Sequence, residues 1–200
     1  MFTIIRNTLR KSRGALIGWG IGLAALAIMM GSMFDMMVAS NEMIDVVNAY
    51  TVAMPELAAM FKMDEMGTPI GWLDVEYFSF VPLIIGLFVT GIGANMLARD
   101  EEDGTLDLIL AHPVSRTALF WGRFLANTLV MIILLLISWA SLLLPMTWSE
   151  NFSIPAFDLL LPFVSMFGIM LFFMTLSLLF GMLLPARSMA RMLSGMLVGA

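Results

Sequence analysis

Long apolar runs alternate with charged segments along the chain, and four of these runs are long enough to cross a bilayer as helices. The first has 21 consecutive residues without a charge, and a helix of that length rises roughly 31 Å, which matches the roughly 30 Å of a hydrocarbon core. The predicted spans are residues 14–34, 77–98, 124–146 and 159–184. A fifth apolar run begins at Met192, and the sequence ends nine residues into it. The pattern predicts an all-α, polytopic integral membrane protein with four complete transmembrane helices and the start of a truncated fifth.

The segment before the first span, residues 1–13, has the pattern of a short amphipathic helix. Phe2, Ile5 and Leu9 fall near one helical face. The opposite face carries Arg6, Asn7, Arg10 and Lys11. Such a helix is typical of the headgroup layer, although a basic flank that only orients the first span would show the same residues. A cleavable signal peptide is disfavoured, because the apolar stretch exceeds the roughly 7–15 residues of a signal core.

Residues 35–76 form the longest polar connection, with eight acidic residues against a single Lys62. We expect one or two short helices at the outer surface there, for example over residues 55–66. Met60, Met63 and Met66 recur in this stretch at a spacing of three. Thioether sulfurs can hold Cu(I), but in a chain with 21 methionines they more often serve as flexible apolar filler.

Glycines in the first span suggest how it packs against another helix, and aromatic residues suggest how the second span is anchored in the membrane. Gly14, Gly18 and Gly22 recur every four residues in the first span, so another helix could approach this stripe closely. Glycine is also simply commoner in membrane helices than in soluble ones. At the start of the second span, Trp72 and Tyr77 are predicted to anchor the helix at the membrane–water interface. Pro82 should lie in its first turn or at a kink.

Composition supports the membrane assignment and excludes most other classes. With 60% hydrophobic and 12% charged residues, the chain cannot cover itself with enough polar surface to remain in water. A net charge of −5 is unsuited to nucleic acid, and the absence of cysteine removes disulfides and thiolate sites. No GxxxxGK[ST] phosphate loop is present and His112 is the only histidine. We therefore expect no enzymatic activity and no cofactor in this chain, and the lack of ionisable residues in the spans disfavours an ion-driven carrier.

The basic residues set the expected orientation. If the N-terminus is inside, nine of the ten Lys and Arg residues lie on the cytoplasmic side, as the positive-inside rule requires, and only Lys62 lies outside. The nine are Arg6, Arg10, Lys11, Arg13, Arg99, Arg116, Arg123, Arg187 and Arg191. We expect a multi-pass protein of the cell (plasma or inner) membrane with a cytoplasmic N-terminus.

Residues 99–123 form the one long charged segment between two spans, and they should contain a short helix. Residues 103–105 (Asp-Gly-Thr) are a suitable helix start, and Pro113 should end the helix. Ser115 is a natural N-cap for the helix that follows. The apolar face of the short helix consists of Leu106, Ile109 and Leu110. This face is either displayed to a cytoplasmic partner or lies on the membrane surface and binds nothing.

This loop resembles the E-x-x-G-T-L-x-x-x-L-x-x-P-[VI]-S-R signature that follows the second span in permease subunits of type-2 ATP-binding-cassette (ABC) exporters. The matching residues are Glu101, Gly104, Thr105, Leu106, Leu110, Pro113, Val114, Ser115 and Arg116. The order of elements over residues 1–191 is also similar to that family. Family members generally have six spans, so by this resemblance the chain would stop short of the full set.

The resemblance implies a single permease domain over residues 1–200, in which residues 105–112 form a coupling helix that docks on a separate soluble ABC ATPase subunit. That subunit would bind ATP and Mg²⁺. The residues expected to serve the coupling are Glu101, Gly104, Thr105, Leu106, Ile109, Leu110, Pro113, Ser115 and Arg116. The resemblance further implies two permease chains, identical or different, that work with two ATPase chains by alternating access in membrane lipid. A non-transporting membrane scaffold or sensor subunit would fit the same hydropathy and is the alternative.

Overall fold

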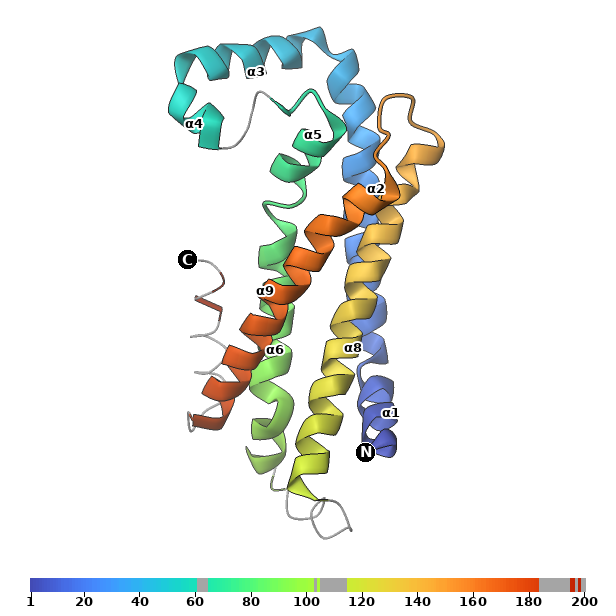
Figure 1. Cartoon of the computed structure of the whole chain (residues 1–200), viewed down its shortest axis with the longest axis vertical. Coiled ribbons are helices and arrows are strands. Elements are labelled where there is room, and N and C mark those ends of the chain that lie inside the picture. Colours follow the sequence, from blue (N-terminus) through green and yellow to red (C-terminus); the bar gives the residue numbers. More distant parts are fainter. Residues whose placement is uncertain (61–64, 103, 105–114, 184–194, 197, 199–200) are drawn as a thin grey trace. The chain divides into compact units, whose positions relative to one another are not determined.

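The structure is a computed structural model that describes residues 1–60, 65–102, 104, 115–183, 195, 196 and 198, with the side chains of residues 41–44 and 98–102 outside the description. Within these residues all regular structure is helical (Figure 1), as the sequence predicts. The elements are α1 (Phe2–Lys11), α2 (Arg13–Ala39), α3 (Asn41–Ala53), α4 (Pro55–Met60), α5 (Pro69–Glu76), α6 (Val81–Glu102), α8 (Arg116–Leu143), the 3-10 turn η2 (Pro145–Thr147) and α9 (Ala156–Leu183).

Three described elements are long and apolar enough to cross a membrane, namely α2, the stretch Arg116–Thr147 that contains α8, and α9. The second predicted span, residues 77–98, does not pass this test as the single helix α6, because α6 passes only together with the preceding α5, as a pair bent by 45°. The described part of the chain therefore has three candidate spans, or four when the bent pair counts as one, rather than four uninterrupted helices. Pro82 is the second residue of α6, where its missing N–H breaks no intrahelical hydrogen bond. The helix accordingly begins at Val81 and not at Tyr77.

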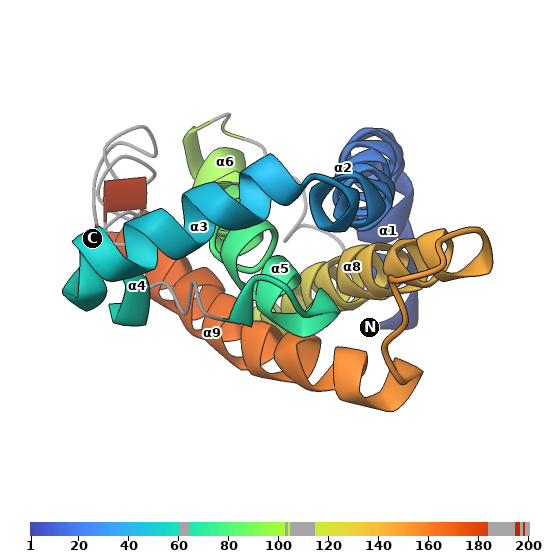
Figure 2. The same ribbon diagram turned by 90° about the horizontal axis from the view of Figure 1, so that it is seen from above.

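Each of the other three membrane helices extends beyond its predicted boundary at one end or both, since a helix ends where its caps allow and not where the hydrocarbon core stops. The helix α2 continues to Ala39, α8 begins at Arg116 and α9 begins at Ala156. The described part of the outer segment holds three helices, α3 to α5, where one or two were expected. Figures 1 and 2 show that α3 leaves the end of α2 at a steep angle. Of the fifth apolar run, only residues 195, 196 and 198 are described.

The chain forms two compact units. Unit 1 comprises Met1–Gly18, Pro82–Leu134 and Ser165–Ala200, and unit 2 comprises Trp19–Val81 and Leu135–Val164. Each unit takes part of α2, α8 and α9, which connect the two without a break in the chain.

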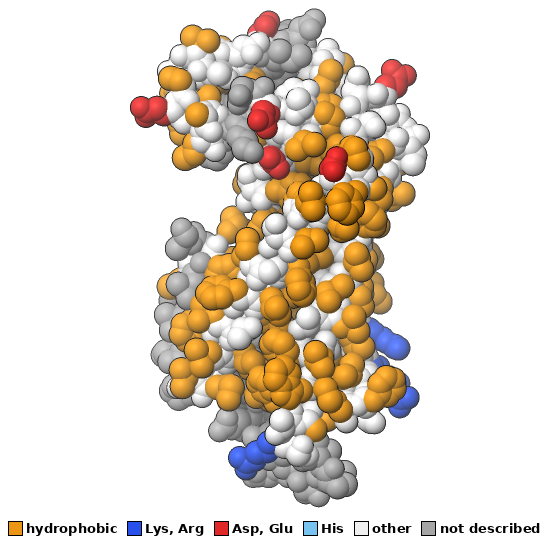
Figure 3. Space-filling view, viewed as in Figure 1, with side chains coloured by type: hydrophobic (Ala, Val, Ile, Leu, Met, Phe, Trp, Pro, Cys, Tyr) orange, Lys and Arg blue, Asp and Glu red, His pale blue; other side chains and the backbone are white. Residues whose placement is uncertain are grey.

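The charged side chains divide between the units by sign. The described basic side chains all belong to unit 1 and are Arg6, Arg10, Lys11, Arg13, Arg116 and Arg123. The described acidic side chains all belong to unit 2 and are Asp35, Asp45, Glu56, Glu65, Asp74, Glu76, Glu150 and Asp158. Figure 3 shows the two kinds over separate elements, on a surface otherwise rich in hydrophobic side chains. An apolar surface of this kind is what a bilayer-spanning chain presents to lipid.

Unit 2 has an aromatic core in which Trp72 and Tyr77 are central. The Trp72 side chain is 5% exposed and donates from Nε1 to the Met30 carbonyl oxygen at 2.9 Å. Its ring lies 6.3 Å from that of Phe34, which in turn lies 5.8 Å from Phe152. Tyr77 is fully buried, and its hydroxyl hydrogen-bonds that of Ser138. The prediction that Trp72 and Tyr77 are interfacial anchors was wrong: both polar tips find partners inside the helix bundle, so neither ring needs the membrane–water boundary.

The Tyr77–Ser138 pair gives a stability prediction. Tyr77→Phe removes one hydroxyl and leaves Ser138, which is 0% exposed, without this partner, at a cost of about 1–2 kcal/mol of unfolding free energy. The double variant Tyr77→Phe/Ser138→Ala should cost less than the sum of the two single variants, because it leaves no orphaned hydroxyl. Thermal unfolding of the four forms in detergent measures this coupling. Additive losses would show that the two hydroxyls do not depend on each other.

In unit 1, α6 and α9 pack backbone to backbone along a seam of small residues. A Cβ atom placed on Gly93 would lie 2.5 Å from the Met174 carbonyl oxygen, and one placed on Gly181 would lie 2.5 Å from the Ala94 carbonyl oxygen. The Ser177 hydroxyl donates to the Thr90 carbonyl oxygen at 2.5 Å across the same seam. Small residues and serine hydroxyls are the means by which membrane helices approach closely.

Candidate functional site

The charged loop is held by the ends of α6 and α8. The helix α6 runs on to Glu102, so the first residues of the predicted loop, 99–102, continue that helix. The helix α8 begins at Arg116, directly after Ser115. The Ser115 hydroxyl accepts from the Ala118 backbone N–H at 3.2 Å, which is the N-cap bond. The sequence prediction of an N-cap at Ser115 is confirmed.

Gly104 is the one described residue of the predicted helix start at residues 103–105. It adopts φ = +66°, the left-handed conformation, two residues after the end of α6. This conformation suits glycine and is common just past a helix C-terminus. Residues 103 and 105–114 lie outside the described residues, so the predicted helix start at residues 103–105 stays a prediction.

Most of the predicted docking face lies outside the described residues. The positions concerned are Thr105, Leu106, Ile109, Leu110 and Pro113, together with the side chain of Glu101. Ser115 and Arg116 are described, and both are exposed. The coupling role of the loop therefore stays a prediction from the sequence.

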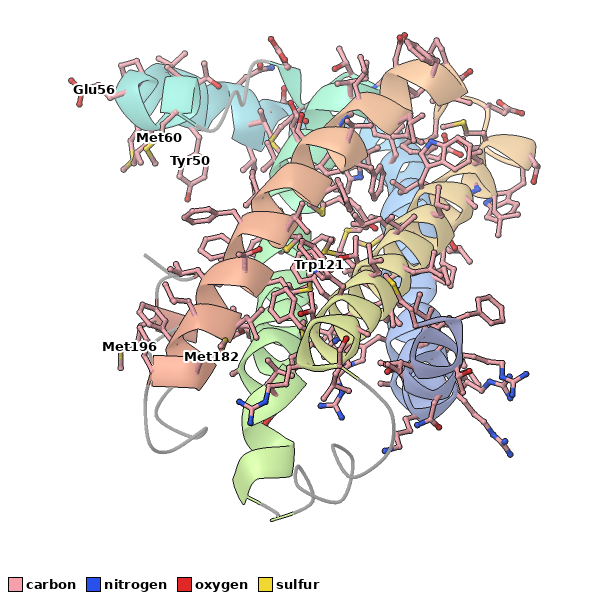
Figure 4. The ribbon with its side chains drawn as sticks, turned by 60° about the horizontal axis from the view of Figure 1, so that its bottom comes forward. Tyr50, Glu56, Met60, Trp121, Met182 and Met196 are labelled. Atoms are coloured by element: carbon pink, nitrogen blue, oxygen red, sulfur yellow. The ribbon has the colours of Figure 1, made fainter. Side chains whose placement is uncertain are left out.

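The other sequence-based candidates do not come together into a site within the described chain. No described atom lies within 4 Å of the place where a Cβ on Gly14, Gly18 or Gly22 would be, and the use of this stripe in packing stays untested. Met60 lies at the end of α4 (Figure 4), and its exposed fraction is 67%. Met63 lies outside the described residues, and the Cu(I) hypothesis is likewise untested.

A groove of about 1200 Å³ lies within unit 1, between the N-terminal helix and two membrane helices. Its first wall consists of Thr3, Ile4, Arg6, Asn7, Thr8, Arg10, Lys11, Ser12 and Ala15. Its second wall, from α6 and α8, consists of Leu87, Phe88, Gly91, Ile92, Asn95, Met96, Leu119, Arg123 and Asn127. The sequence analysis did not find this groove, because its residues come from three separate stretches.

The helix α1 is positioned by a close contact with α8. A Cβ on Gly122 would lie 2.9 Å from Cγ2 of Ile4, so the absence of a side chain at Gly122 lets α1 approach. Ile4, Ile5 and Leu9 are half-buried, whereas Phe2 is 77% exposed. The predicted amphipathic helix is present, but Ile4 rather than Phe2 completes its packed face.

The second wall carries three polar side chains. Arg123 on α8 donates from Nη1 to the Met96 carbonyl oxygen on α6 at 2.7 Å. Asn95 donates from Nδ2 to the Gly91 carbonyl oxygen at 2.7 Å. The Asn127 side chain is only 6% exposed, and no residue that the structure describes hydrogen-bonds its carboxamide. These groups give an otherwise apolar wall a polar centre, and the Arg123 bond ties α6 to α8.

Comparison with known proteins gives one match. The sequence model of a family described as "ABC-2 family transporter protein" matches residues 2–199. No curated protein and no solved structure matches the chain.

Proposed function

We propose that this chain, which belongs to the ABC-2 family of transporter proteins, is the membrane-spanning permease subunit of an ATP-driven exporter. The single observation that carries the proposal is the family match over nearly the whole chain, residues 2–199. The three or four candidate spans are what such a subunit needs to form a pathway through the bilayer. The chain has no phosphate-binding loop, so the energy must come from another protein.

The loop between α6 and α8 is the proposed point of coupling. Its signature residues, 101–116, stand directly between the two helix ends. Gly104 adopts the left-handed conformation two residues after α6, and the Ser115 cap fixes the start of α8. Arg123 and Met96 join the two helices close to that end. A force applied to the loop would therefore move α6 and α8 together, which is the mechanical property that a coupling element requires.

The separation of charge supports the proposed orientation. Unit 1 contains all of the described basic side chains and unit 2 all of the described acidic ones. By the positive-inside rule, the N-terminus and the coupling loop, which flank the spans in unit 1, would face the cytoplasm. A soluble ATPase in the cytoplasm could then reach the loop.

The proposed partners follow from this arrangement. A soluble ABC ATPase subunit would bind ATP and Mg²⁺ and dock on residues 105–112, and a second permease chain would complete the pathway. The open stripe at Gly14, Gly18 and Gly22 is one surface on which a second chain could pack. The outward direction of transport rests on the resemblance of the loop to that of type-2 exporters.

Co-purification tests the proposed function. The full chain, carrying an affinity tag and extracted from its native membrane in mild detergent, should bring down a soluble protein with Walker motifs and ATPase activity. A tagged, unrelated polytopic protein from the same membrane serves as the control. A preparation that is folded and membrane-derived but repeatedly lacks any such ATPase would favour the scaffold or sensor role instead.

A further inference from the structure

The groove in unit 1 has the chemistry of a site for an anionic amphiphile. Four of its lining residues are basic, namely Arg6, Arg10, Lys11 and Arg123, and none of the described lining residues is acidic. Although the chain has a net charge of −5, the described charged side chains that line this groove are basic and make it positively charged. Such a surface attracts a negatively charged group and repels a cation.

Asn127 adds a requirement for a polar ligand atom. Its side chain is 94% buried, lines the groove and has no hydrogen-bond partner among the described residues. An amide buried in this way is unfavourable unless something accepts from its N–H groups or donates to its oxygen. The oxygens of a phosphate or ester would accept from the Nδ2 hydrogens.

The second wall adds apolar surface beside the polar groups. Leu87 is 59% exposed, and Phe88 and Ile92 beside it are half-buried. Their side chains line the groove along α6. The volume of about 1200 Å³ also exceeds the roughly 300–1,000 Å³ typical of small-molecule pockets. A free phosphate would leave this surface uncovered, whereas an acyl chain would cover it.

We propose that this groove binds an anionic phospholipid from the leaflet in which α1 lies. The basic residues of α1 hold the phosphate headgroup, Asn127 donates to a phosphate or ester oxygen, and an acyl chain lies against Leu87, Phe88 and Ile92. The inference goes beyond the proposed transport function and does not depend on it, because binding requires only this chain and a lipid. Three features of the groove determine this ligand class: its basic residues, the Asn127 amide without a described partner, and its apolar wall.

Lipid retention by the purified full chain tests the proposal. The chain is delipidated in neutral detergent, mixed with phosphatidylglycerol or phosphatidylcholine, and the bound lipid is counted by native mass spectrometry. We expect phosphatidylglycerol to bind at least about tenfold more tightly, because the attraction is electrostatic in part. Equal binding of the two lipids would overturn the proposal. Displacement of phosphatidylglycerol by excess glycerol phosphate would overturn the lipid assignment and leave a site for a soluble phosphate.

One triple variant and one double-variant control locate the site. The triple variant Arg6→Gln/Arg10→Gln/Lys11→Gln should lose most of the preference for phosphatidylglycerol. The control Arg13→Gln/Arg116→Gln removes basic residues of the same unit that do not line the groove, and it should retain the preference. An equal loss in both would mean that general surface charge, and not the groove, attracts the lipid.

Asn127→Leu separates lipid binding from a structural role. The variant should lose affinity for phosphatidylglycerol while its thermal unfolding temperature without lipid stays equal or rises, because it removes a buried amide that lacks a partner. A variant that unfolds at a lower temperature would show that the amide serves the fold. Unchanged affinity in a folded Asn127→Leu protein would contradict the role of this residue in lipid binding.

Discussion

Aspartate at position 106 or 110 is expected to abolish the productive interaction with the ATPase while the chain still inserts in the membrane. Leu106 and Leu110 lie on the predicted apolar face of the coupling helix, which would be buried in a groove of the partner. Introducing a carboxylate into an apolar contact leaves it desolvated and unpaired. Residues at the centre of an interface typically contribute 2 kcal/mol or more, so affinity should fall by at least about 30-fold.

The measurement is the amount of ATPase retained on the tagged permease, together with the ATP hydrolysis rate of the assembled complex. Leu108→Asp is the matched control, since Leu108 lies on the opposite side of the same predicted helix from Leu106 and should tolerate the charge better. All three variants should reach the membrane in equal amounts. Equal losses in all three would show that the apolar face has been assigned wrongly, and full retention in Leu106→Asp and Leu110→Asp would remove the coupling role.

Gly181→Ala is expected to destabilise unit 1, because the added methyl group overpacks the seam between α6 and α9. The new Cβ would lie 2.5 Å from the Ala94 carbonyl oxygen and 3.0 Å from the Ala94 Cα. Both atoms belong to the backbone of α6, so no flexible side chain can move aside, and the two helices must separate. Overpacking of this kind costs about 1–3 kcal/mol.

Gly168→Ala on the same helix is the control. No atom lies within 4 Å of the Cβ that it would add, so the higher helix propensity of alanine should leave stability unchanged or raise it by up to about 1 kcal/mol. Thermal unfolding in detergent, followed by circular dichroism, compares the two variants with the native chain. Equal unfolding temperatures for Gly181→Ala and Gly168→Ala would mean that α6 and α9 do not pack as described.

The sequence was most informative where local chemistry decides the structure. Apolar length located the membrane helices to within several residues, because a helix must match the thickness of the hydrocarbon core. The cap at Ser115 was also predictable, since a serine oxygen directly before a helix accepts a backbone N–H whatever the tertiary context. The family resemblance of the loop agrees with the match over residues 2–199.

The sequence was least informative where packing between distant segments decides. The spacing of Gly14, Gly18 and Gly22 is visible in one helix, but no described atom lies within 4 Å of a Cβ added there, and their use in packing stays a prediction. The glycines that are used, Gly93 and Gly181, lie on different helices and show no spacing to find. Whether each glycine lies against the backbone of the other helix depends on which faces of α6 and α9 pack together.

The same limit applies to polar and aromatic side chains. Trp72 and Tyr77 lie at the edge of an apolar run. At such a position the sequence does not distinguish a side chain at the membrane interface from one in the protein core. Their hydrogen bonds to Met30 and Ser138 place them in the core. From the sequence alone, the Asn127 amide could form a hydrogen bond with any neighbouring helix. Only the three-dimensional arrangement brings it to the groove without a partner.

The central claim is that residues 101–116 face the cytoplasm and receive an ATPase, and single cysteines test it directly because the chain has none. Leu110→Cys places a thiol on the predicted docking face, and Met60→Cys places one in the outer segment, at a position that is 67% exposed. In intact cells, a membrane-impermeant maleimide should label position 60 and leave position 110 unlabelled. In the purified complex, a short thiol-to-amine crosslinker should join position 110, but not position 60, to the ATPase. Labelling of position 110 from outside, or crosslinking of the ATPase through position 60 alone, would contradict the account.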